Sequence, residues 1–288
     1  MVYSKLDWCI LKHITCIVLA FAFTCLVGCS SSPTATIGLQ PGKVPVVTGQ
    51  SVLVEMDSGS LDVTSGEVGQ LTISGSTSKA DPVSYTVGST GNQVHIVSEY
   101  KSHSFLQAAV APIQMEIHVP NGIPVMVKTG DSVVKVHDYN GSVNVTSIAG
   151  EILAQNVNGM FVFNSNRGNM TVKNGSGEIH LLGNYGFQNL IDTHGNVNAS
   201  TIMGTVQFAG RIAAGDQFHI ETDHGSVEIQ LSPDSNTGIN IHTTSGVVSC
   251  IAADLIPAWA ACSGSFNQAE GQLDIRTVSG SVMIQQMP

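Results

Sequence analysis

A repeat of nine residues is the feature that most restricts how this chain can fold. Through the middle of the sequence, glycines recur at an unbroken spacing of nine. They are Gly141, Gly150, Gly159, Gly168, Gly177, Gly186, Gly195 and Gly204. Nine residues suffice for one short β-strand and a tight turn, and glycine accepts the positive φ that such a turn needs. The repeat therefore predicts a stack of short strands.

The residues that follow each glycine alternate between apolar and polar. Of the sixteen positions two and four residues after these glycines, fifteen are apolar, where an apolar content of 42% would give about seven. Alternation with a period of two is typical of strands with one buried face. Positions such as Val197 are thus expected to point into a core, and their neighbours, such as Asn198, to point outward.

Two units of nine would make a coil of about 18 residues, with stacked strands about 4.8 Å apart. We therefore predict an all-β fold: a parallel β-solenoid (β-helix) of short coils with two main faces, preceded by a less regular β-rich N-terminal region. A meander sandwich is the alternative, but it explains only the alternation and not the period.

The first 28 residues have the features of an export signal. Lys5 and Lys12 make the start basic, and residues 14–27 form an apolar run that is short for a bilayer span of about 20 residues. The run ends in Leu26-Val-Gly-Cys29, which resembles the lipobox of bacterial lipoproteins. The resemblance implies cleavage before Cys29, its acylation and a stable anchor in a lipid bilayer. An ordinary signal peptide or an uncleaved anchor is the alternative.

This resemblance implies a lipid-anchored protein of the bacterial cell envelope. Ser30 follows the cysteine, which favours the outer membrane if the organism has two membranes. Residues 29–50 are expected to form the lipidated Cys and a flexible tether, because they are rich in Ser, Pro, Thr and Gly. The β-rich N-terminal region would then cover 51–127, and the solenoid 128–288 with an insertion at 251–270.

The charge of the chain excludes one class of partner. The formal net charge is −10, and charged residues make up 11% of the sequence. An acidic chain is a poor binder of a phosphate backbone, so we expect no nucleic-acid partner. The oligomeric state stays open.

No residue pattern indicates catalysis or a cofactor. Calcium-binding nonapeptide repeats need Gly-Gly-x-Gly-x-Asp, which no unit has. Ser76 to Lys79 and Ser98 to Lys101 match Ser-x-x-Lys, but that motif needs a helix. Polysaccharide-active enzymes need clustered carboxylates, whereas Glu151 and Glu178 lie three units apart. We therefore predict that the protein is not an enzyme.

Histidine and cysteine leave two alternatives open. Stacking could align His180, His194, His219 and His224 as a metal site, although solvated rows on a surface are the favoured interpretation, so no metal is predicted. Cys250 and Cys262 are a possible disulfide across the insertion, since export favours oxidation. The competing interpretation is that Cys250, at an inward position, packs as a small hydrophobic residue.

The layout resembles a bacterial β-strand-repeat family called "putative adhesins", most of whose function is unknown. The matching segments are residues 117–120 (IHVP), 125–127 (VMV), 243–247 (TTSGV) and 277–282 (TVSGSV). The resemblance implies the solenoid fold and no agreed catalytic residues.

The function we expect is non-catalytic: adhesion, or binding of a glycan or protein, by a membrane-anchored lipoprotein. Rows of outward polar residues would make the surface, among them Asn144, Asn189, Asn196 and Asn198. One alternative is a periplasm-facing structural scaffold that uses an open last strand near Val282–Gln285 to pair with another chain. A polysaccharide-active β-helix enzyme is less favoured.

Overall fold

The computed structural model of the chain describes residues 35–37, 42–77, 83–100, 113–251, 255–258 and 260–287. The chain divides into two compact units, 1–34 and 35–288, and every described residue belongs to the second unit. Over these residues all regular structure is β-strand, and no helix there is long and apolar enough to cross a membrane. The export signal, Cys29 and its acylation lie outside the described part.

The strands are numbered along the chain. They are β1 (Ala35–Ile37), β2 (Gly42–Pro45), β3 (Ser51–Gly66), β4 (Gln70–Thr77), β5 (Val83–Thr90), β6 (Gln93–Tyr100), β7 (Ile113–Pro120), β8 (Val125–Ile191), β9 (His194–Gly210), β10 (Gln217–Thr222), β11 (Ser226–Leu231), β12 (Thr237–Thr243), β13 (Val248–Ile251), β14 (Leu255–Ala258), β15 (Ala261–Phe266), β16 (Gly271–Thr277) and β17 (Val282–Gln286).

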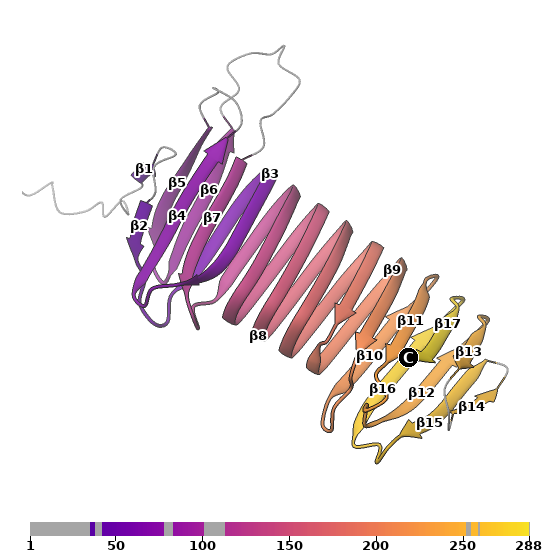
Figure 1. Ribbon diagram of the computed structural model, residues 1–288. Helices are drawn as coiled ribbons and strands as arrows, with labels where there is room; N and C mark the ends of the chain where they lie inside the picture. The colour runs from indigo at the N-terminus through magenta and orange to yellow at the C-terminus, as the bar shows by residue number, and fades with distance from the viewer. Residues whose placement is uncertain are drawn as a thin grey trace, which may run out of the picture. The chain divides into compact units, whose positions relative to one another are not determined.

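The nine-residue repeat forms 18-residue coils, as the sequence predicted. β9 pairs in parallel with the end of β8 at a separation of 18, from Ser176 opposite His194 to Ile191 opposite Ala209. All sixteen positions two and four residues after the repeat glycines are buried. The all-β solenoid is therefore confirmed, and Figure 1 shows its regular coils between two less regular ends.

Each coil contributes one strand to each of two faces. We call the face that contains the strands after Gly141, Gly159, Gly177 and Gly195 the first face, and the other the second face. Among those sixteen positions the one polar residue is Gln188, which lies in the second face and donates a hydrogen bond from Nε2 to the Ser200 carbonyl at 2.7 Å. The other inward residues make one continuous hydrophobic core along the solenoid.

At one corner, the backbone adopts a left-handed conformation once per coil. Asp138, Asn156, Asn174 and Asp192 are 18 residues apart and have φ between 47° and 54°. Asn and Asp tolerate this conformation better than other side-chain-bearing residues. Asn156 Nδ2 donates to Asp138 Oδ1 at 2.9 Å, and Asn174 Nδ2 to Asn156 Oδ1 at 3.0 Å. The hydrogen bonds join successive turns into a polar column.

The N-terminal end departs from the expected boundaries. β3 pairs in parallel with the first coil of β8, from Val52 opposite Val125 to Thr64 opposite His137. On its other side it pairs with β6 and β7, and antiparallel β5 and β4 follow. Within the expected less regular β-rich region over 51–127, residues 51–66 thus form a regular coil, and 58 residues that fold outside this coil separate it in sequence from the coil it contacts.

The expected tether over 29–50 is also too long. β1 pairs with β5 and β2 pairs with β4, both antiparallel. The Val46 side chain is buried in the core. Residues 42–46 are therefore part of the folded unit, since Val44 packs against the core and Val46 is buried in it.

At the C-terminal end, the last coil in sequence is not the last coil in space. β16 lies between β10 and β12, and β17 lies between β11 and β13, with all four pairings parallel. The predicted open strand near Val282–Gln285 is therefore wrong, because both of its edges are paired. The insertion at 251–270 contains β14 and β15, which pair antiparallel with each other, while β15 caps β12.

Candidate functional site: the outer surface of the first face

The outer surface of the first face runs the length of the solenoid. Strand pairing aligns one outward residue from each coil, so the surface consists of rows across the strands. One row contains Val97, Glu55 and Lys128 near the N-terminal end, and Leu182, Ser200, Glu221, Arg276 and His242 toward the other end. A neighbouring row contains His180, Asn198, His219, Asp274 and Asn240.

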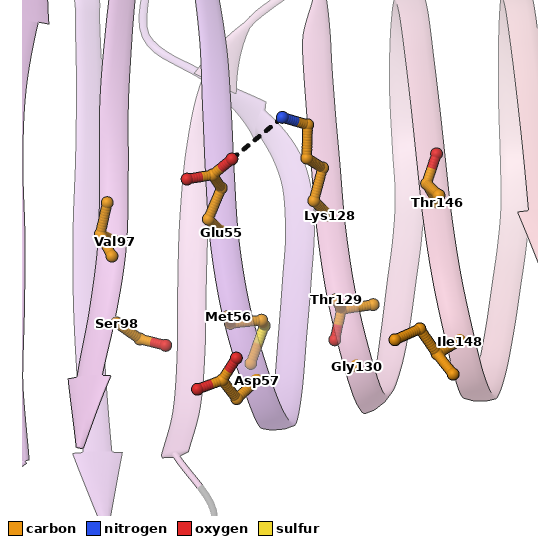
Figure 2. Close-up of a pocket in the computed structure, with 10 residues that line it drawn as sticks. All are labelled: Glu55, Met56, Asp57, Val97, Ser98, Lys128, Thr129, Gly130, Thr146 and Ile148. Atoms are coloured by element: carbon orange, nitrogen blue, oxygen red, sulfur yellow. Dashed lines mark hydrogen bonds and ion pairs between the residues drawn. The ribbon is translucent and has the colours of Figure 1, made fainter.

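A groove of about 720 Å³ lies on this surface near the N-terminal end. Its lining residues are Glu55, Met56, Asp57, Val97, Ser98, Lys128, Thr129, Gly130, Thr146 and Ile148. Figure 2 shows Glu55 and Lys128 facing each other on neighbouring strands, with Val97 on one side and Thr146 on the other. Its volume is in the range of small-molecule sites, and its walls mix apolar and hydrogen-bonding groups.

The Glu55 carboxylate is held as an anion. Lys128 Nζ lies 3.0 Å from Oε1, and His95 Nε2 lies 2.8 Å from Oε2. The hydrogen bond from Lys128, followed by that from His95, lowers the pKa of Glu55. A general acid for glycosidic cleavage needs the opposite shift, toward neutral pH. The groove is thus suited to binding a ligand rather than to protonating one.

A smaller depression of about 290 Å³ lies toward the C-terminal end of the same surface. It is lined by Glu178, Asn196, Val197, Asn198, Gln217, Phe218, His219, Gln272 and Asp274. Val197 and Phe218 are buried, so the accessible groups are the amides, carboxylates and imidazole of four parallel strands. We call this set the polar depression. It offers hydrogen-bond donors and acceptors on a backbone fixed by its ladders.

The structure brings some of the residues singled out in the sequence together and separates others. Asn196 and Asn198 line the polar depression, Asn144 lies exposed on the same face, and Asn189 lies on the second face. His180 and His219 share a row but are separated by Asn198.

Three of these histidines each contact a carboxylate or a hydroxyl group, not another histidine. His180 Nε2 lies 2.9 Å from Glu178 Oε1, and His194 Nδ1 lies 3.0 Å from Asp216 Oδ2. His224 Nδ1 lies 2.6 Å from Ser279 Oγ. Over the described residues, no three His, Cys, Asp or Glu side chains are grouped to hold a metal ion.

The two Ser-x-x-Lys matches are only partly described. Ser76 Oγ donates to Gln114 Oε1 at 3.4 Å on a strand, and Ser98 is an almost buried residue of the groove. Their lysines, Lys79 and Lys101, lie outside the described residues. Both serines are on strands, which do not provide the helical geometry that the motif needs.

The two cysteines meet at the C-terminal end of the core. Cys250 lies on β13 in the second face, and Cys262 lies on β15 above the first face, where its side chain is buried. In the structure they form a disulfide, with Cα atoms 6.7 Å apart. That separation is within the range of natural disulfides. Such a bond would link the two faces where no further coil covers them.

Two features were missed in the sequence. The groove joins Glu55 to Lys128 across 73 residues, and no local pattern indicates that pairing. Most first-face strands also end in a buried Ser or Thr three positions before the next glycine. These include Ser147, Ser165, Thr201, Thr222, Thr243 and Thr277. A recurring Ser/Thr-x-x-Gly in the repeat was the signal that could have found this third inward position.

Comparison with known proteins finds distant structural similarities. No curated protein matches it. It is similar to the structure of a "putative adhesin" from Bacteroides fragilis, with 12% identity, 88% of this chain and 98% of that chain covered, and a TM-score of 0.47. A "putative cell adhesion protein" from Clostridium sporogenes has 12% identity, coverage of 86% and 99%, and a TM-score of 0.28. A "putative lipid binding protein" from Parabacteroides distasonis has 10% identity, coverage of 85% and 96%, and a TM-score of 0.33.

These similarities are too distant to transfer a ligand. The match to the family described as Toastrack DUF4097 is a match of the sequence to a family model. It extends over residues 50–285, about four fifths of the chain. It begins beside β3 and ends within β17, so it contains every coil of the solenoid. The chain belongs to the Toastrack DUF4097 family.

Proposed function

We propose that this protein is a non-catalytic binding protein of the bacterial envelope, anchored by an acylated Cys29, that presents the outer surface of its first face to a glycan or protein. The observation that carries the proposal is the polar depression. Four parallel strands there present hydrogen-bonding side chains side by side, and buried apolar residues, among them Val197 and Phe218, lie beneath them. A rigid array of this kind recognises a partner without moving.

The groove supports binding over catalysis. Both carboxylate oxygens of Glu55 are already engaged by Lys128 and His95. The pKa of Glu55 is shifted away from the neutral range that a general acid requires. A polysaccharide-active enzyme would need a second carboxyl group free to act beside the first.

The described chain begins at the end of the solenoid that lies opposite the polar depression. The folded chain begins at β1 and β2, the outermost strands of the N-terminal end, whereas the polar depression involves β9, β10 and β16 near the other end. The polar depression is thus separated from the first described strand by most of the length of the solenoid.

Protease treatment of intact cells tests the location. Cleavage on intact cells, together with loss of the Cys29→Ala variant from the membrane fraction, is the result we expect for a surface lipoprotein. Protection until lysis would overturn surface adhesion. Membrane retention of the Cys29→Ala variant would overturn the anchor.

A second variant pair tests the surface. Changing Asn198 and His219 to Ala should abolish attachment of cells to glycan- or protein-coated plates, whereas the same change at Asn144, outside the polar depression, should not. Equal attachment by both variants would contradict the proposed site.

One observation favours the scaffold alternative. Among the described strands β13 pairs only with β17, and its inward side chains Val248 and Cys250 are half-buried, unlike the other inward residues of the second face. The edge available for strand addition is therefore β13 rather than β17. Cross-linking of a partner strand to Ser249, if found on lysed but not on intact cells, would support this function.

A further inference from the structure

Seven glycines from seven coils form one column along a corner of the solenoid. In spatial order they are Gly150, Gly168, Gly186, Gly204, Gly225, Gly280 and Gly246. From Gly168 onward, a Cβ on each glycine would lie between 1.6 and 2.5 Å from the carbonyl oxygen of the previous one. No side chain can be accommodated at these positions, so the surface along the column is bare backbone, and we call this strip with the residues that flank it the trough.

The walls of the trough change character at one coil. The residues on either side of the column are Arg167 and Asn169 in one coil, but Tyr185 and Phe187 in the next. Tyr185 is 48% exposed and Phe187 is 54% exposed. Every other aromatic side chain whose burial the structure describes is buried. Exposure of two neighbouring aromatic rings is unfavourable in water, and it marks a contact surface.

A cavity of about 290 Å³ opens beside Phe187. It is lined by Gly186, Phe187, Met203, Gly204, Thr205, His224, Gly225 and Ser226. The set combines an aromatic ring, two hydroxyls and an imidazole, and none of its members is Lys, Arg, Asp or Glu. Ser279 Oγ lies 2.6 Å from His224 Nδ1 and orients the ring, and over the described residues no partner is recorded for Nε2.

We propose that this trough is a binding site for a neutral oligosaccharide. The apolar face of a sugar ring stacks on Phe187 or Tyr185, and the bare backbone of Gly186 and Gly204 lets the ring approach closely. Thr205, Ser226 and His224 then supply hydrogen bonds to its hydroxyls. A linear glycan extends along the column, since successive glycines keep the floor free of side chains. The proposal rests on the proposed binding role but uses none of the residues of the polar depression.

The test is titration of the full-length protein, purified in detergent, with three neutral hexasaccharides: those of β-1,4-glucose, α-1,4-glucose and β-1,4-N-acetylglucosamine. Two variants put the neighbouring coils' residues into the aromatic coil: Phe187→Thr, as at Thr205, and Tyr185→Arg, as at Arg167. Met160→Ala, at an exposed residue away from the trough, is the matched control. We expect one hexasaccharide to bind, each trough variant to weaken it at least tenfold, and the control to bind like the unchanged protein.

Three outcomes would overturn the proposal. Binding of no hexasaccharide would exclude a neutral glycan, and binding that survives both trough variants would place the glycan elsewhere, for example in the polar depression, leaving the proposed function intact. The third is concentration-dependent self-association that the Phe187→Thr change abolishes. Exposed Leu182 and Ile202 extend the apolar surface near the trough, so that result would assign it to a second copy.

Discussion

The middle of the solenoid and its two ends are built from the same nine-residue unit but differ in the order of their strands and in how the strand edges are covered. Between Gly141 and Gly210 the chain adds coils in sequence order, and each pairs with the residue 18 positions away. At both ends the order is broken, and antiparallel strands are added. A parallel stack has two open edges that invite pairing with other chains, and antiparallel caps cover them. The repeat thus governs growth of the stack, whereas the irregular segments govern its termination.

The two ends also differ from each other. At the N-terminal end β3 is inside, β6 and β7 are outside, and both faces carry antiparallel strands. At the C-terminal end β16 and β17 are inside, but only the first face is extended, by β15 and β14. The second face stops at β13 among the described strands, which is where the proposed disulfide lies. We infer that a covalent link there takes the place of a missing strand.

The largest effect should come from a charge placed inside the regular middle. Val197→Asp buries a carboxylate at a position that is 1% exposed, and should lower the free energy of unfolding by about 4 kcal/mol or more. Asn198→Asp, the outward neighbour, should change it by less than about 0.5 kcal/mol. Thermal and urea unfolding followed by circular dichroism measures both. Equal effects would show that the assigned register is wrong.

A smaller loss should follow from adding one methyl group to the glycine column. In Gly204→Ala the new Cβ would lie 2.4 Å from the Gly186 carbonyl oxygen, so the coils must separate, at about 2–3 kcal/mol. Gly238→Ala, at the C-terminal end, meets its nearest neighbours at 3.8 Å and serves as the control. Comparable urea midpoints for the two variants would contradict the close approach of the corner glycines.

The disulfide should stabilise one end without affecting the middle. Changing both Cys250 and Cys262 to Ala removes a link over 12 residues, for which loss of about 2–3 kcal/mol is expected. Because coils contact only their neighbours, the loss should remain local. Hydrogen exchange should accelerate in β12, β13 and β15 but not in β8. Thiol labelling of the exported protein that does not increase on reduction would show that the bond is absent.

The smallest effect concerns pH at the groove. Lys128 and His95 hold the folded-state pKa of Glu55 below its ordinary value of 4.5. The stabilisation is therefore fully present above pH 4.5 and is lost as the pH falls through the lowered folded pKa. Glu55 is about one third exposed, so solvent screening limits the gain to about 1 kcal/mol or less. Glu55→Gln should lower the Tm slightly at pH 7 and match the unchanged protein at strongly acidic pH. A Tm difference that persists there would assign the effect to packing.

The regular part of this fold could be predicted because its information is local. The glycine spacing predicts the coil length, and the alternation of apolar and polar residues predicts which side chains point inward. It also identified Gln188 as the one polar residue among the sixteen positions expected to be inward. The order of coils at the ends could not be predicted, because it depends on which strand edge the chain returns to. β16 has the same Gly-x-apolar-x-apolar unit whether it lies outermost or between two coils. The groove was missed for the same reason, since Glu55 and Lys128 meet only after 58 intervening residues fold outside them.

The inserted terminal coil has a consequence for biogenesis. The chain is synthesised from its N-terminus, and folding units ordinarily form as they emerge. Here β12 and β13 are made before the strands that separate them from β10 and β11, so the stack cannot be completed by adding coils in the order of synthesis. The C-terminal end is finished only when residues 271–286 arrive and enter between coils already made. Completion of the stack therefore depends on a segment that is made after the coils on both sides of it, and a chain that stops before residue 271 would lack the strands that join β10 to β12 and β11 to β13.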